Sequence, residues 1–352
     1  MILVVNAGSS SLKLGLFEGA QQVAQARAEG IGTGGAADHA AALATGLAEM
    51  GGHRLRAAAH RVVHGGVGLT APCRITPGVE AQIAALVPLA PLHNPAALAG
   101  IAALRALQPD LAQYASFDTA FHATNPMVAL RYAIPQAAHD AGIRRYGFHG
   151  ISYAALVGTL RARGDLPQRL LACHLGNGAS LCAILDGQSV ATTMGYSPLD
   201  GLTMGTRAGG IDGNAVLALA SMHGIAGAGD VLNRQSGLLA LGGSHDMRET
   251  GAAARAHFIY WAVRHAGSMV AAMGGLDGIV FTGGIGEHDA GVRAGIVGGL
   301  GFLGARLDAG ANEASAGQLH ASGARVAIWT VAAAEERQIA AEAMAVMAAE
   351  RA

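Results

Sequence analysis

The sequence predicts an α/β protein built from two duplicated domains, and three observations support this class. The chain has 352 residues, which is more than one ordinary hydrophobic core usually holds. Alanine-rich amphipathic stretches alternate with short apolar runs, a pattern typical of α/β proteins. Two glycine-turned hairpins, at Gly8 and at Gly178, are predicted about half a chain apart, as expected for a duplicated domain.

The first hairpin is predicted at the start of the sequence. Ile2 to Val5 is an apolar run that leads into turn residues at positions 6–10. Ser11 to Phe17 then places every second residue from Leu12 to Leu16 on one face, which indicates a strand. A Walker-type phosphate loop is followed by a helix. The alternation of every second residue after Gly8 indicates a strand instead and excludes such a loop.

Further elements follow the same two periodicities. Leu170 to His174 and Ser180 to Leu185 are predicted as the strands of the second hairpin, and Gly278 to Thr282 as a strand that breaks into the glycine-rich segment 283–286. The predicted helices are Ala81 to Leu89, Pro95 to Leu107, Asn214 to Met222, one from about Asp289, and a last one over roughly Ala332 to Arg351.

Composition excludes several classes of protein. Hydrophobic residues make up 51% of the chain and charged residues 13%, which indicates a packed globule. The net charge is −1 and no basic run exists to follow a nucleic acid backbone. No apolar run approaches a membrane span, and no basic leader precedes the first strand. The three cysteines lack metal-ligand spacing and are read as reduced thiols, so a cytoplasmic location is expected.

The first turn carries donors suited to a polyphosphate. Residues 6–11 supply backbone N–H groups and hydroxyls, and Lys13 adds an ammonium. Of 23 basic residues, Lys13 is the only lysine, which suggests a position where a compact point charge is needed. The alternative interpretation is an ordinary polar hairpin.

Other motifs carry groups for phosphoryl transfer. Arg61 stands between a strand-like segment and a Gly pair, where it could clamp an anion. Its neighbours His60 and His64 have the spacing of a helical zinc pair, but Val62 and Val63 favour a strand. Single residues in turn-rich or strand-end positions complete the set: His93, His149, Asp118 and Arg207. Together they form an inventory for phosphoryl transfer with magnesium.

Eight strings, in order over essentially the whole chain, closely resemble the acetate kinase family. They are Asn6 to Lys13, His60 to Gly66, Pro91 to Pro95, Phe117 to His122, Gly147 to Gly150, His174 to Gly178, Met204 to Arg207 and Gly284 to Glu287.

The resemblance implies an actin-like ATPase fold of two duplicated ribonuclease-H-like domains with a nucleotide cleft between them. The expected domains are 1–119 together with 335–352, and 120–334. The implied reaction is reversible transfer of the ATP γ-phosphoryl group to acetate, giving acetyl phosphate and ADP. The implied substrates are acetate or acetyl phosphate and ATP or ADP. The implied metal is Mg²⁺, which Mn²⁺ could replace, and the implied protein partner is a second copy of the chain in a homodimer.

The resemblance also implies site residues. The catalytic candidates are Asn6, Arg61, Asp118, His149 and Arg207, and the metal candidates are Asn6 and Glu335. The substrate candidates are Arg61, Val63, Leu92, His93, Phe148 and Pro198, of which the four apolar side chains would form a wall against the acyl chain. The ATP candidates are Ser9, Ser11, Lys13, His174, Leu175, Gly176, Asn177, Gly178, Asp246, Met247, Arg248, Gly284, Ile285, Gly286, Glu287 and His288.

Three positions depart from the family pattern, and two alternative functions stay open. Tyr153 stands where a second His is usual, Gly210 where an Asp is usual, and His288 where an Asn is usual. A propionate or other short-chain acyl kinase is the first alternative, because one methylene changes binding by only about 1–3 kcal/mol. The second is an actin-like ATPase with water as acceptor, which the apolar wall and Arg61 disfavour.

Overall fold

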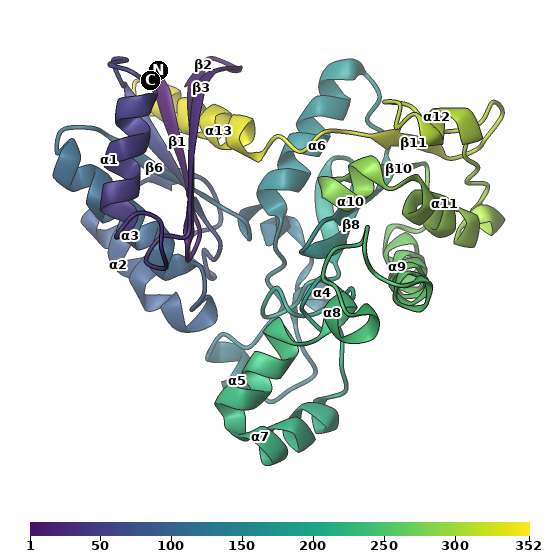
Figure 1. The fold of residues 1–352 in the computed structure, drawn as a ribbon. Coiled ribbons are helices and arrows are strands. Elements are labelled where there is room, and N and C mark those ends of the chain that lie inside the picture. Colours follow the sequence, from purple (N-terminus) through teal and green to yellow (C-terminus); the bar gives the residue numbers. More distant parts are fainter. The chain divides into compact units, whose positions relative to one another are not determined.

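The computed structural model describes residues 1–352, which form two compact units. Unit 1 comprises Met1–Ala123, Gly150–Ala155 and Ala334–Ala352. Unit 2 comprises Thr124–His149 and Leu156–Ala333. Each unit contains one mixed β-sheet with helices packed on it, which confirms the predicted α/β class (Figure 1).

The sheet of unit 1 has the order β3-β2-β1-β4-β6-β5. The first three strands form an antiparallel meander, while β1, β4 and β6 run parallel to one another. The short β5 is antiparallel to β6 at the edge. The strands are β1 Ile2–Ala7, β2 Ser11–Glu18, β3 Gln21–Glu29, β4 Ala57–Val62, β5 Cys73–Arg74 and β6 Gln113–Phe117.

The sheet of unit 2 repeats this arrangement, with the order β11-β10-β7-β8-β9. Here β7, β8 and β9 form the antiparallel meander, and β7, β10 and β11 run parallel. Even the irregularity between the second and third strands recurs, at Leu16/Phe17 and at Ala183/Ile184. The repeated order confirms the predicted duplication. The strands are β7 Arg169–Leu175, β8 Ala179–Leu185, β9 Gln188–Thr192, β10 Gly278–Thr282 and β11 Ala327–Thr330.

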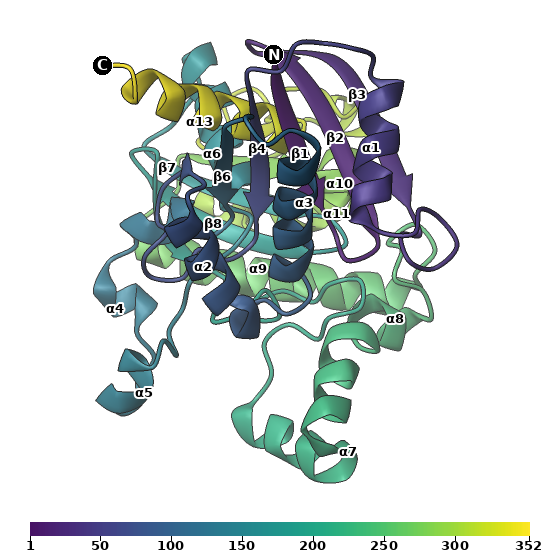
Figure 2. The ribbon, with the colours of Figure 1, turned by 90° about the vertical axis from the view of Figure 1, so that its left-hand side faces the viewer.

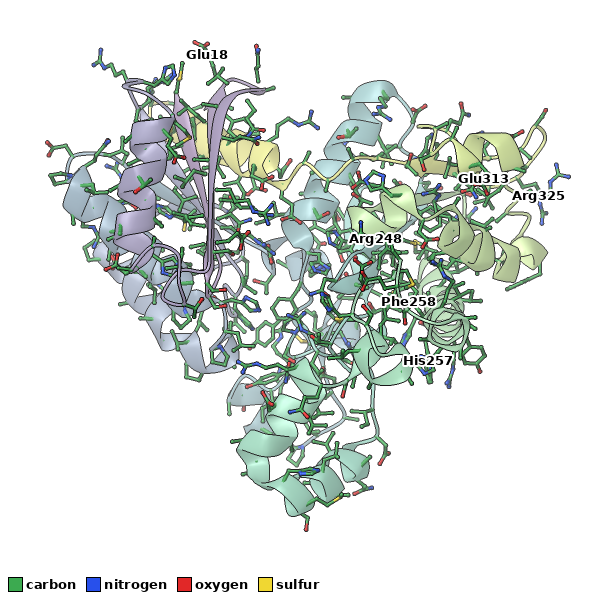
Figure 3. The ribbon with its side chains drawn as sticks, in the orientation of Figure 1. Glu18, Arg248, His257, Phe258, Glu313 and Arg325 are labelled. Carbon is green, nitrogen blue, oxygen red and sulfur yellow. The ribbon has the colours of Figure 1, made fainter.

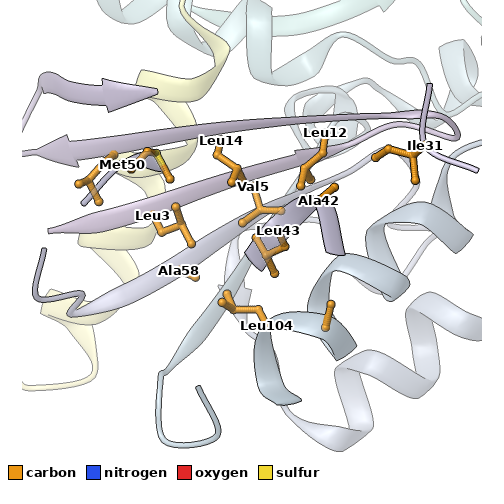
Figure 4. Packing of buried hydrophobic residues seen from close by; sticks show 12 residues of the cluster. Leu3, Val5, Leu12, Leu14, Ile31, Ala42, Leu43, Met50, Ala58 and Leu104 are labelled. Atoms are coloured by element: carbon orange, nitrogen blue, oxygen red, sulfur yellow. The ribbon is translucent and has the colours of Figure 1, made fainter. Parts of the chain in front are cut away.

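The core of unit 1 follows from strand alternation. Leu12, Leu14 and Leu16 are buried on one face of β2, together with Leu43 and Leu104 from two helices (Figure 4). These helices are α1 His39–Glu49 and α3 Asn94–Leu107. On the other face, α13 Glu335–Ala349 packs its buried side chains against β1 and β4. Helix α2 Pro77–Ala85 lies beside α3. Layers on both faces keep the strand ends of this unit in fixed positions.

In unit 2, helix α9 Ala252–Met273 packs on β7, β8 and β9, and α11 Ala290–Gly299 packs on α9. The other α-helices of this unit are α4 Met127–Leu130, α5 Gln136–Asp140, α7 Gly213–Arg234, α8 Gly237–Gly242, α10 Gly283–His288 and α12 Ala309–Glu313, while α6 Gly150–Arg163 begins in unit 1 and continues into unit 2. Three short 3₁₀ helices complete the chain: η1 Val87–Leu89, η2 Ala120–Thr124 and η3 Gly301–Leu303.

Helix α7 differs from the other long helices because most of its surface is exposed. It extends away from the sheet of its unit (Figure 2), and Leu217, Met222 and Ile225 are 68%, 72% and 87% exposed. By length and composition alone it is the one helix of the chain that could cross a membrane, although a helix of a soluble protein can pass the same test. A non-helical residue, Gly224 with φ 71°, interrupts it.

Three predicted elements differ from the structure. The helix predicted over Ala81 to Leu89 begins at Pro77 and ends at Ala85, and η1 follows it. The glycine-rich segment after β10 was expected to be irregular but forms α10, because the Glu287 carboxylate accepts the Gly283 N–H at 3.0 Å and satisfies a donor of the first turn. The helix predicted over Asn214 to Met222 continues to Arg234, with Asp212 accepting N–H groups at its start.

Candidate active site

Three neighbouring parallel strands of unit 1 end at the same edge of the sheet, and each ends in a predicted site residue. Asn6 lies near the end of β1, Arg61 near the end of β4, and Asp118 directly after β6. The register pairs Val5 with His60 and Val62 with Phe117, so these three residues follow one another across the edge. The carboxyl ends of parallel strands are the usual place for ligands in α/β sheets.

Arg61 and Asp118 form a bidentate ion pair. Arg61 Nε donates to Asp118 Oδ1 at 3.1 Å, and Nη2 donates to Oδ2 at 2.7 Å. A second carboxylate, Glu335 at the start of α13, lies 3.8 Å from Arg61 Nη1. Burial opposes the charge of Arg61, but Asp118 and Glu335 outweigh it and raise the pKa of Arg61. Burial raises the pKa of Asp118, and Arg61 opposes that rise.

The turn between β1 and β2 is tight. Gly8 N–H donates to the Ser11 carbonyl at 2.8 Å, and a Cβ on Gly8 would lie 2.6 Å from the Ser11 hydroxyl, so a side chain at position 8 would displace that hydroxyl. His39 Nε2 lies 2.8 Å from the Gly8 carbonyl and holds the turn from α1. Ser9 is exposed and available to a ligand. Lys13 is exposed and lies opposite Asn6 in the β1–β2 register.

An amide holds the loop that carries Val63. Asn94 Oδ1 accepts the His64 N–H and Asn94 Nδ2 donates to the His64 carbonyl, each at 3.2 Å. Because His93 and Leu92 directly precede Asn94, the same amide fixes both segments. His60 is on strand β4, and its Nε2 hydrogen-bonds Gln113 at 2.7 Å. His60 and His64 therefore do not form a helical zinc pair.

Unit 2 brings three predicted residues together around the turn at Gly178. The rings of His149 and His174 stack with centroids 4.0 Å apart and an interplanar angle of 24°. A Cβ built on Gly178 would lie 3.3 Å from His149 Nε2 and 3.7 Å from Arg207 Nη1, so the side chains of His149 and Arg207 both border this turn. Arg207 is partly buried, and burial lowers its pKa.

A cavity of about 630 Å³ opens at the carboxyl ends of β7 and β10. It is large enough for a nucleotide. Eight predicted ATP-binding residues line it: Gly176, Asn177, Asp246, Met247, Arg248, Gly284, Ile285 and His288. His245 and Asp289 also line it and were not predicted, although each directly follows or precedes a predicted residue.

Two predicted ATP-binding carboxyl groups have different surroundings. Arg248, which is labelled in Figure 3 and belongs to the segment that joins α8 to α9, donates to Asp246 at 2.5 Å and lowers the pKa of Asp246 to about 2. Glu287 does not line the cavity. Its Oε1 accepts N–H groups of Gly283 and Ala333, each at 3.0 Å, so it holds α10 in place.

The four predicted wall residues are divided between the units. Val63 and the partly exposed Leu92 belong to unit 1, and Phe148 and Pro198 belong to unit 2. Phe148 is buried, and the Pro198 carbonyl accepts a hydrogen bond from Arg207 at 3.4 Å.

Comparison with known proteins gives consistent results. The model of the acetokinase family matches residues 33–341. An acetate kinase of Methylocella silvestris is 38% identical, with 98% of each chain covered. The crystal structure of Porphyromonas gingivalis acetate kinase has a TM-score of 0.90 at 33% identity, covering 98% of this chain and 99% of that one. A propionate kinase structure from Francisella tularensis has a TM-score of 0.89 at 33% identity, covering 97% and 98%. These likenesses, with the repeated sheets, confirm the predicted duplicated ribonuclease-H-like fold.

Proposed function

Because this chain belongs to the acetokinase family, we propose that it transfers the γ-phosphoryl group of ATP to the carboxylate of acetate, giving acetyl phosphate and ADP. The chain is a phosphotransferase with a carboxyl group as acceptor. The observation that carries the choice of acceptor is the guanidinium of Arg61, held at a strand end by the bidentate pair with Asp118. A fixed guanidinium matches the geometry of a carboxylate.

The residues divide into three roles. Arg61 binds the acceptor carboxylate and orients its oxygen for in-line attack. Arg207 and His149 neutralise the charge on the equatorial oxygens of the transferred group, which is where such charge develops. The turn at Gly8, with Ser9, Ser11 and Lys13, and the cavity lined by Asn177, Met247 and Ile285 bind ATP.

Magnesium is the proposed metal, and the donor set fits it. Mg²⁺ is usually held by one or two carboxylates together with substrate phosphates. Asp118 and Glu335 both lie beside Arg61, and Asn6 lies near the end of the neighbouring strand. When bound, the metal would neutralise charge on the phosphates. Asp118 and Glu335 would hold it directly or through water, and Mn²⁺ has the same preference for oxygen ligands.

The apolar wall gives the proposed size limit of the acyl group. Val63, Leu92, Phe148 and Pro198 are proposed to contact the methyl group of acetate. One extra methylene alters discrimination by about 10–200-fold, so propionate is the closest competing substrate. The similarity to a propionate kinase makes this the second candidate function.

A homodimer in the cytoplasm is proposed as the working form. The exposed apolar side chains of α7 support a partner surface, because monomers rarely leave large apolar patches uncovered. The three cysteines form no disulfide, as is usual in a reducing compartment.

A hydroxamate assay with ATP, Mg²⁺ and the series from formate to butyrate tests the proposed acceptor. Acetate should have the highest kcat/KM, with propionate lower by about one to two decades. A preference for propionate would assign the second candidate function. A preference for butyrate would overturn the proposed acetate pocket.

A further inference from the structure

His149 is held on several sides by its surroundings in unit 2. Its backbone is left-handed, with φ 59°, at the residue before α6, a conformation that few non-glycine residues adopt. Two residues directly opposite each other on β7 and β8, His174 and Ser180, hold the ring. His174 stacks on its face, with ring centroids 4.0 Å apart. The Ser180 hydroxyl lies 2.8 Å from its Nδ1.

The direction of the ring follows from this arrangement. With Nδ1 directed at Ser180, Nε2 faces the turn at Gly178, where Arg207 Nη1 also lies. Ser180 is fully buried, so water does not compete for its hydroxyl. A buried hydroxyl that bonds one ring nitrogen fixes the rotation of an imidazole, and therefore the direction of its other nitrogen.

We propose that Ser180 is a positioning residue for phosphoryl transfer, whose hydroxyl directs Nε2 of His149 toward the Gly178 turn beside Arg207. This inference rests on the proposed function. When the neutral ring carries its proton on Nε2, the hydroxyl donates to Nδ1 and Nε2–H can donate to a phosphoryl oxygen. In the protonated ring the hydroxyl accepts from Nδ1–H, and Nε2–H still donates.

Strand formation does not require this hydroxyl. The backbone pairing of β7 and β8 holds Ser180 in register whatever its side chain is. The neighbouring strand offers a matched control: Ser189 on β9 is also fully buried, but its hydroxyl lies 3.3 Å from Cys182 Sγ.

Kinetics of Ser180→Ala, Ser180→Cys and Ser189→Ala form the first test. Ser180→Ala should lower kcat by roughly ten- to a hundredfold with little change in either KM, because a misdirected group loses the transition-state contact. Ser180→Cys, with a weaker donor of similar size, should fall between Ala and the native chain. Ser189→Ala should keep native kcat. Equal losses in Ser180→Ala and Ser189→Ala would overturn the proposal.

A double-mutant cycle separates positioning from a general structural effect. In a His149→Ala background, Ser180→Ala should cost almost nothing further, because no ring remains to be directed. If the double variant lost kcat by the product of the two single losses, Ser180 would not act through His149.

Nitrogen-15 NMR of histidine-labelled protein gives a readout that does not depend on activity. The His149 resonances, assigned by their loss in His149→Gln, should shift in Ser180→Ala, because Nδ1 then loses its hydrogen bond to the hydroxyl. Unchanged His149 shifts in Ser180→Ala would overturn the positioning role. If the native chain forms no acyl phosphate, the proposed function fails, while these shifts still decide whether Ser180 directs the ring.

Discussion

Arg61, near the end of β4, and Asp118, directly after the adjoining parallel strand β6, share two hydrogen bonds of 3.1 and 2.7 Å. Asp118 is only 2% exposed, whereas the Arg61 side chain keeps about a quarter of its surface open at 23%. The carboxylate therefore orients the guanidinium through Nε and Nη2, while Nη1 points toward Glu335 at 3.8 Å. Substitutions of Arg61 and of Asp118 should therefore have different effects on the kinetics.

Substitution of Arg61 should affect binding of the acceptor. Arg61→Ala should raise the KM for acetate and lower kcat together, while Arg207→Ala should mainly lower kcat, because charge on the transferred group develops only in the transition state. Arg61→Lys should recover little activity, since an ammonium cannot form the two parallel bonds. Steady-state kinetics with acetate as the varied substrate measure this difference. Native kinetics in either Ala variant would remove that arginine from the site.

Replacement of Asp118 should nearly abolish activity at every magnesium concentration. Asp118→Asn keeps the shape but removes the charge that orients Arg61 and that would hold the metal. A magnesium titration of initial rates checks this, with the exposed Asp110→Asn as the control that should behave as the native chain. Full recovery of Asp118→Asn in excess Mg²⁺ would mean that Asp118 contributes only metal affinity.

Lys13→Arg should impair turnover although the charge is kept. Lys13 is exposed opposite Asn6, two residues beyond Ser11, where a flexible point charge can reach a phosphate bound at the turn. Lys13 is the only lysine of the chain, so peptide mapping after treatment with an amine-directed reagent measures the labelling of Lys13 directly. Its labelling should fall with ATP and Mg²⁺.

The exposed Arg54→Lys variant supplies a reference amine that nucleotide should not protect. Unchanged labelling of Lys13, together with full activity of Lys13→Arg, would assign the first hairpin a purely structural role.

Two buried histidines of unit 1 should make stability fall in mild acid. Burial lowers the pKa of His60 to about 4, although its bond to Gln113 opposes this shift, and burial also lowers the pKa of His64 to about 4. The unfolded chain therefore binds more protons than the folded chain between about pH 6.5 and pH 4, and the free energy of unfolding decreases as pH falls through that window.

Urea denaturation at pH 7 and pH 5 measures this dependence. His60→Gln, which can still donate to Gln113, should reduce the loss of stability between the two pH values by roughly 2 kcal/mol. The exposed His53→Gln should leave the loss unchanged. An equal pH dependence in the native chain and His60→Gln would show that His60 does not titrate between the folded and unfolded states.

Strand periodicity accounts for what could be predicted of the fold. Leu12, Leu14 and Leu16 alternate and are buried, so the first hairpin follows from local pattern. Strand β3 was not predicted, because its sequence from Gln21 to Glu29 is mostly polar and exposed, and it is held by pairing with β2. Helix α10 was missed because its glycines suggest a turn, whereas the cap from Glu287 is a contact that periodicity does not encode.

The candidate site was predictable where a motif and a strand end coincide. Arg61 and Asp118 were each placed correctly at strand ends, but their mutual ion pair joins residues 57 positions apart and required the sheet order. Ser180 was missed for the same reason, since its relation to His149 exists only in three dimensions. His245 and Asp289 were within reach, because they adjoin predicted cavity residues.

Phosphorus-31 NMR of the complete reaction is the most direct test of carboxylate phosphorylation. With ATP, Mg²⁺ and acetate, ADP and acetyl phosphate should appear in equal amounts, and ADP should not accumulate when acetate is omitted. Formation of ADP with inorganic phosphate at a rate independent of acetate would contradict the account, because water rather than a carboxylate would then be the acceptor.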